Sequence, residues 1–171
     1  MVSDAPRQKP LLLLDVDGVL NPFPRTPEGF YEYKLFAGDE DPVRLSARHG
    51  EWLRELGAIF EIVWASAWGE AANELLCPIF DLPPFPVVPF PAVPFEPRDK
   101  LPAVDAFARE RTAAWVEDIV TEEARAWVAE RTVPTLIVEV NSASGLTREI
   151  VQELQGWEAT LGFRQEPAYE R

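Results

Sequence analysis

The chain has 171 residues, of which 47% are hydrophobic and 11% aromatic, values typical of one globular domain with a substantial core. Its 29 Asp and Glu residues outnumber its 16 Lys and Arg residues, giving a formal charge of −13. Such acidity argues against broad, unassisted binding to a nucleic-acid backbone, although it leaves room for a local basic pocket that holds one phosphate.

The first predicted element is the most informative one. The run LLLLDVDGVLN occupies residues 11–21, and its apolar start predicts a strand over 11–16 that is buried on both faces. Asp15 and Asp17 come at the end of this strand. A buried carboxylate needs a partner or a metal ion because an unpaired charge is costly to bury. Ligands bind at this end of the strands in open α/β sheets.

The segments around the first strand are less regular. Residues 1–10 are expected to form a loose leader, and residues 21–42, rich in Pro, Gly and aromatic residues, to form a flap that could contain a short hairpin. A helix is predicted over 43–56, ending before Gly57. A second buried strand is predicted over 60–66.

The middle of the chain contains a short predicted helix at 69–76, followed by seven prolines within residues 83–97. Because proline cannot donate a hydrogen bond to a β-ladder, this proline-rich segment is either an edge strand or an extended loop, and the sequence leaves both open. Asp99 is expected to cap a helix that runs to about residue 110.

The last third continues the alternation. Strands are predicted over 113–117 and 135–140, and helices over 121–132, with Thr121 as its cap, and 145–156. Alternating strands and helices predict an α/β fold with a mostly parallel sheet between two helical layers. The whole chain is expected to be one domain.

Polar side chains follow several predicted strands, and parallel strands would bring them to one edge of the sheet. A basic pair also precedes the strand at 113–117. The candidates are Asp15, Asp17, Ser66, Glu117, Asp118, Arg98 and Lys100. Asn141 and Ser142 also follow a strand, but a structural role is favoured for them.

This set of groups suits phosphoryl transfer. Several carboxylates at one place repel unless a hard cation such as Mg²⁺ lies among them. The cation and a Lys or Arg can then neutralise a bound phosphate. One carboxylate can act as nucleophile and a second as general acid and base. Ser66 could donate to a phosphate oxygen, or cap the next helix, or both, and Gly18 allows close approach of the backbone.

At this point the residues resemble a known family. DVDGVLN is similar to the first motif of the haloacid dehalogenase-like (HAD) superfamily of phosphatases, and Ser66, Lys100 and Glu117-Asp118 follow in the order of its other motifs. The resemblance implies that Asp15 is the nucleophile and Asp17 the general acid and base. It also implies that Mg²⁺ is held by Asp15, the Asp17 backbone carbonyl and an acid of the fourth motif.

The resemblance extends to the fold and to a finer group. It implies a Rossmann-like three-layer sandwich with five strands in the order 3-2-1-4-5. The short segment between the first two motifs has room for a flap but not for a folded cap domain. For the metal ion, Asp118 is the first choice and Glu117 the second, since strand alternation directs only one of them inward. The pattern WASAW, RDK, WVED and GLT is similar to small HAD domains related to those of RNA-repair proteins.

Several expectations remain to be tested. Gly18, Ala67, Trp68 and Arg98 are candidate phosphate or substrate contacts, with Arg98 as the alternative to Lys100. A phosphorylated small molecule is the favoured substrate. A nucleic-acid end and a non-catalytic binding or regulatory module are the alternatives, and the proline-aromatic surface could serve a homodimer.

Three further expectations concern the interior and the compartment. His49 is expected at the surface of the helix over 43–56, and Cys77 in the core. A lone cysteine excludes an intrachain disulfide and fits a reducing compartment. With no signal peptide and no apolar run of the ~20 residues that span a membrane, we expect a cytoplasmic protein without a membrane partner.

Overall fold

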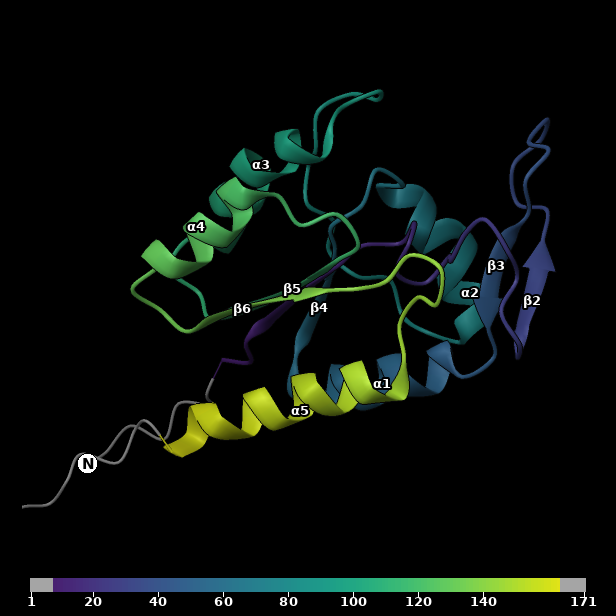
Figure 1. Cartoon of the computed structure of the whole chain (residues 1–171). Helices are drawn as coiled ribbons and strands as arrows, with labels where there is room; N and C mark the ends of the chain where they lie inside the picture. The colour runs from purple at the N-terminus through teal and green to yellow at the C-terminus, as the bar shows by residue number, and fades with distance from the viewer. Residues whose placement is uncertain (1–7, 164–171) are drawn as a thin grey trace, which may run out of the picture.

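The computed structural model describes residues 8–163, so most of the predicted leader lies outside the described residues. Its centre is a parallel sheet of four strands in the spatial order β4-β1-β5-β6 (Figure 1). The strands are β1 (Leu11–Leu14), β4 (Glu61–Trp64), β5 (Ala113–Glu117) and β6 (Thr135–Glu139). The predicted α/β class, parallel pairing and order of these four strands are therefore confirmed.

Two helical layers cover the sheet on opposite sides, as Figure 1 shows. One layer holds α1 (His49–Ile59) and α5 (Arg148–Phe163), and the other holds α3 (Lys100–Ala108) and α4 (Glu122–Glu130).

The side chains of β1 connect the sheet to both layers. Leu12 and Leu14 belong to the apolar core on the α1 and α5 side. Leu11 and Leu13 belong to the core on the α3 and α4 side. All four leucines are fully buried, because successive side chains of a strand point to opposite faces and both faces are covered.

The proline-rich segment does not supply a fifth strand. Val87 makes a single isolated parallel bridge to Trp64 at the outer edge of β4, and residues 83–97 otherwise run as loop, with a 3₁₀ turn at Pro97–Asp99. The expected fifth strand is reduced to this bridge, because prolines lack the N–H groups that would extend the ladder.

A hairpin lies beside the main sheet and corrects the prediction for residues 43–56. Strand β2 (Phe30–Tyr33) pairs antiparallel with β3 (Val43–Ser46), and α1 begins only at His49. The expected hairpin is therefore present, but its second strand lies beyond the predicted end of the flap at residue 42. Val43 and Leu45 are buried in the core, so pairing with β2 outweighs the helical pattern that follows.

His49 is buried, which overturns its expected place at the surface. Its ring lies among Phe30, Trp52 and Phe80, with ring centroids 5.4, 5.8 and 5.9 Å away. The hairpin supplies Phe30 and so covers the first turn of α1. The predicted helix over 43–56 left no strand at residues 43–46 to form this hairpin, so the burial of His49 could not be predicted.

The remaining helices differ from their predictions mainly at their ends. The helix expected at 69–76 is a π-helical segment (Ala72–Leu76) followed by α2 (Cys77–Phe80), with Cys77 buried as predicted. The last helix, α5, begins and ends later than expected and reaches Phe163. Within residues 8–163, no helix combines the length and the apolar character needed to span a bilayer.

Two predicted helix caps have different outcomes. Thr121 caps α4, and its side chain accepts the backbone N–H of Ala124. Asp99 precedes α3 but does not cap it with its side chain. Its carboxylate accepts the N–H of Glu96 instead, at 2.8 Å, and so closes the 3₁₀ turn before the helix.

Candidate active site

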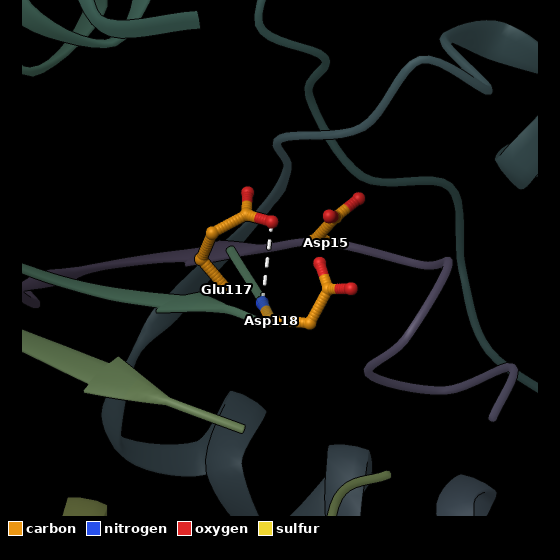
Figure 2. A group of neighbouring side chains, drawn as sticks. All are labelled: Asp15, Glu117 and Asp118. Carbon is orange, nitrogen blue, oxygen red and sulfur yellow. Dashed lines mark hydrogen bonds between the residues drawn. The ribbon is translucent and has the colours of Figure 1, made fainter. Parts of the chain in front are cut away.

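Three carboxylates meet where β1 and β5 end. Leu14 of β1 lies opposite Val116 of β5, so the next residues, Asp15 and Glu117, emerge side by side at the same edge of the sheet. Asp15, Glu117 and Asp118 each place a carboxylate oxygen within 4.8 Å of the others. Figure 2 shows the Asp15 and Asp118 side chains on the same side, with Glu117 turned back toward the Asp118 backbone.

Lys100, the first residue of α3, is the cation of this site. Its Nζ donates to Asp15 Oδ2 at 2.9 Å and to Glu117 Oε2 at 2.7 Å, and all three residues are buried. Loss of hydration alone would lower the pKa of Lys100, but the charges of Asp15 and Glu117 outweigh it and raise this pKa. The lysine therefore stays protonated between the two carboxylates.

Arg98, the predicted alternative to Lys100, lies outside this contact. Its side chain is 69% exposed and pairs with Glu96 at 2.9 Å. The geometry thus favours Lys100 over Arg98 as the cation next to Asp15.

Glu117 has both carboxylate oxygens engaged by the protein. Oε2 accepts from Lys100, and Oε1 accepts the backbone N–H of Asp118 at 3.2 Å. Burial raises the pKa of Glu117, the charge of Asp15 raises it further, and Lys100 acts in the opposite direction. These contacts favour Asp118 rather than Glu117 as a metal ligand, in keeping with the order expected from the sequence.

Gly18 makes room for the Asp118 carboxylate. Its φ is +77°, and a Cβ placed there would overlap the Asp118 side chain. Both the backbone conformation and the missing side chain are therefore required at this position. The glycine lets the loop after β1 pass directly beside the fourth-motif acid.

Asp17 lies at the exposed rim of the site, and each oxygen of its carboxylate accepts one side-chain N–H. Asn21 Nδ2 donates to Oδ1 at 2.9 Å, and Trp68 Nε1 donates to Oδ2 at 3.0 Å. Although the residue as a whole is exposed, protein atoms displace water from its carboxylate. This desolvation raises the pKa of Asp17 against the lowering effect of the two donors.

Ser66, Ala67 and Trp68 form the turn that follows β4. Ser66 is buried, and its Oγ accepts the backbone N–H of Trp68 at 3.3 Å. The Gly69 N–H bonds the Ser66 carbonyl, so Ser66 stabilises a turn rather than capping a helix. Ala67 is exposed. Trp68 is a candidate phosphate or substrate contact from the sequence, and its indole N–H donates to the Asp17 carboxylate.

Two residues of this arrangement escaped the sequence analysis. Asn21 ends the DVDGVLN motif and holds Asp17, and Phe36 packs on Trp68 with ring centroids 4.9 Å apart. The amide of Asn21, four residues after Asp17, was a readable signal. Phe36 carried none, because its contact depends on how the hairpin folds.

The donor set at the sheet edge fits a hard divalent cation. Carboxylate oxygens are ligands that Mg²⁺ prefers, and Asp15, Glu117 and Asp118 bring three of them together. Lys100 pairs with two of these residues, Asp15 and Glu117. Such a cluster remains anionic with one ammonium, so a cation of charge two would relieve the repulsion.

Comparison with known proteins identifies the family. Residues 11–151 match the family model described as the HAD domain in Swiss Army Knife RNA repair proteins. The chain belongs to this family of HAD domains. No curated protein matches the chain significantly. The HAD resemblance drawn from DVDGVLN is thus confirmed, and the matched segment includes β1, the hairpin, all strands of the main sheet and the acid cluster.

Proposed function

We propose that this HAD domain is a Mg²⁺-dependent phosphomonoester hydrolase that forms an aspartyl-phosphate on Asp15. The observation that supports it most is the acid cluster of Asp15, Glu117 and Asp118 around one buried lysine, at the sheet edge where ligands bind. Membership in a HAD family links the chain to hydrolases. The nucleophile, the metal ion and the substrate are parts of our proposal.

The proposed reaction has two steps. A carboxylate oxygen of Asp15 attacks phosphorus while the bond from phosphorus to the leaving oxygen breaks, and protonated Asp17 gives that oxygen its proton. Water then attacks the aspartyl-phosphate and passes a proton to Asp17. The bond between phosphorus and Asp15 breaks, which releases inorganic phosphate and restores both carboxyl groups.

The other residues stabilise charge. Asp15 and Asp118 would hold Mg²⁺, which supplies positive charge for the phosphate oxygens. Lys100 offsets negative charge at Asp15 throughout the reaction. Glu117 keeps Lys100 in place through the bond to Oε2. Ser66 lies at the same edge and is a candidate donor to a phosphate oxygen.

The substrate has two candidate classes. A phosphorylated small molecule suits the charge of −13, which disfavours long anionic polymers. A phosphorylated RNA end is the second candidate, because the family is described from RNA repair proteins. Between β1 and β4 the chain has the β2–β3 hairpin and α1 but no folded cap domain, and a site without such a cap could accept either class.

The direct test is a panel of phosphorylated metabolites and of oligonucleotides with 3′- or 5′-phosphates, assayed with Mg²⁺. We expect turnover of at least one class, loss on chelation and recovery when Mg²⁺ is restored. In Asp118→Asn, the Mg²⁺ concentration for half-maximal activity should rise by roughly tenfold or more. Losing even a residue that only hydrogen-bonds a metal ligand weakens metal affinity by that factor.

Asp105→Asn is the matched control, because Asp105 lies on the same helix as Lys100 but outside the acid cluster. It should leave the Mg²⁺ requirement unchanged. If the wild-type chain binds Mg²⁺ but hydrolyses no phosphomonoester, the proposal is wrong and a non-catalytic binding module is favoured.

A further inference from the structure

Both donors to Asp17 are themselves held by the β2–β3 hairpin. The Trp68 ring packs edge-on against Phe36, which lies in the loop 34–42 between β2 and β3, with centroids 4.9 Å apart. Asn21 Oδ1 accepts the backbone N–H of Arg44 in β3 at 2.8 Å. The carboxylate of Asp17 is thus connected to the hairpin through two separate side chains.

These contacts restrict an otherwise mobile group. An exposed aspartate side chain samples several rotamers, whereas Asp17 has one oxygen bonded to Asn21 and the other to Trp68. Each oxygen keeps a second lone pair that can carry the proton needed for general acid catalysis. Proton transfer requires hydrogen-bond distance to the leaving oxygen, so a fixed carboxylate is more effective than a rotating one.

We propose that Trp68 is a positioning residue for Asp17, and that Phe36 of the hairpin loop holds the Trp68 indole in place. This inference rests on the proposed role of Asp17 as proton donor to the leaving group. It assigns the hairpin a part in catalysis that is separate from substrate contact.

The test uses Trp68→Phe, which keeps an aromatic ring but removes the N–H that bonds Asp17. kcat/KM is measured for 4-nitrophenyl phosphate, whose leaving group departs without much help, and for an alkyl phosphate, whose leaving group needs a proton. We expect kcat/KM for the alkyl ester to fall by roughly tenfold and that for the aryl ester to change little. A purely structural role would lower both to the same extent.

Trp127→Phe is a matched control. The Trp127 indole also donates to an aspartate, Asp105, at 2.7 Å, but on the α3–α4 side of the sheet. Its loss should leave the ratio of the two kcat/KM values unchanged. Phe36→Ala should shift the ratio in the same direction as Trp68→Phe, and an unchanged ratio would show that Phe36 does not hold the indole.

A double variant tests whether Trp68 acts through Asp17. In an Asp17→Asn background, adding Trp68→Phe should cause no further loss for the alkyl ester, because the group it positions no longer donates a proton. An additional loss of the same size would overturn the inference.

A readout independent of turnover is the NMR signal of the Trp68 indole N–H. Asp17→Asn should shift this signal and leave that of Trp127 in place, and an unmoved Trp68 signal would contradict the contact. Equal losses of kcat/KM for both esters in Trp68→Phe would overturn the positioning role of Trp68 but leave the proposed function standing. Absence of any wild-type turnover overturns it together with the proposed function.

Discussion

At the scale of single residues, Lys100 explains how two acids can lie buried together. A lone buried carboxylate is strongly unfavourable, yet Asp15 and Glu117 both contact the Lys100 ammonium within 2.9 Å. The lysine also gives Asp15, the proposed nucleophile, a charged neighbour at hydrogen-bond distance.

His49 provides a prediction at the same scale. Burial lowers its pKa from 6.5 to about 4, so the folded protein keeps the imidazole neutral at a pH where the unfolded chain protonates it. Stability from this residue is complete above pH 6.5 and is lost as the pH falls toward 4. The largest possible loss is about 3 kcal/mol, at about 1.4 kcal/mol for each unit of pKa shift.

The measurement is the free energy of unfolding in urea for the wild type and for His49→Leu between pH 7 and pH 4. Glu117 changes the stability in the opposite direction on acidification, because burial raises the pKa of its carboxyl group. Only the difference between the two proteins therefore isolates the contribution of His49. We expect the wild type to lose stability relative to the variant on acidification. Parallel curves would show that folding does not lower the pKa of His49.

At the scale of elements, the start of α4 is stabilised by residues close to one another in the sequence. Helix α4 begins with Thr121, whose side chain accepts the N–H of Ala124 at 3.2 Å, and with Glu122 and Glu123 in its first turn. These acids interact favourably with the helix dipole. The sequence TEEARAW showed this start clearly because all the contacts that define it are local.

Removing the Thr121 cap should affect stability but not catalysis. Thr121→Ala should lower the free energy of unfolding by about 1 kcal/mol, since the Ala124 N–H loses its acceptor. Thr121→Ser keeps the hydroxyl and serves as the control. Urea unfolding measures the change, and a fall in kcat/KM without a fall in stability would contradict a purely structural role for this cap.

The hairpin shows why some elements could not be predicted. Val43 and Leu45 are brought into the core by pairing with β2, a contact between segments about ten residues apart. The stretch is too short for its period of two to stand out beside the helical pattern of α1. The same long-range placement buries His49 and brings Phe36 onto Trp68, so both were outside the reach of local sequence patterns.

At the scale of the whole molecule, the parallel sheet accounts for the part of the site that could be predicted. Asp15 follows β1, Ser66 lies just beyond β4, and Glu117 ends β5. Parallel pairing sends all these strand ends to one edge. The order of the motifs and the alternation of strands with helices were therefore enough to predict that these groups lie at one edge of the sheet.

The finer contacts depended on three-dimensional detail. The choice between Lys100 and Arg98 needed the position of α3, which brings only the lysine to Asp15. The number of strands also needed the structure, because Val87 makes one bridge where a full edge strand was one of two open outcomes. Asn21 accepts the backbone N–H of Arg44 in the hairpin, and Phe36 of the hairpin loop packs on Trp68, and no motif described either contact.

The central claim is that Asp15 is the nucleophile of a Mg²⁺-dependent phosphatase, and one measurement tests it most directly. Hydrolysis of 4-nitrophenyl phosphate is followed for the wild type and Asp15→Asn with Mg²⁺ present, with circular dichroism to verify the fold. We predict that kcat falls at least roughly a thousandfold while the fold is retained, because the amide cannot form the phospho-enzyme. A folded Asp15→Asn variant that keeps wild-type turnover would contradict the account.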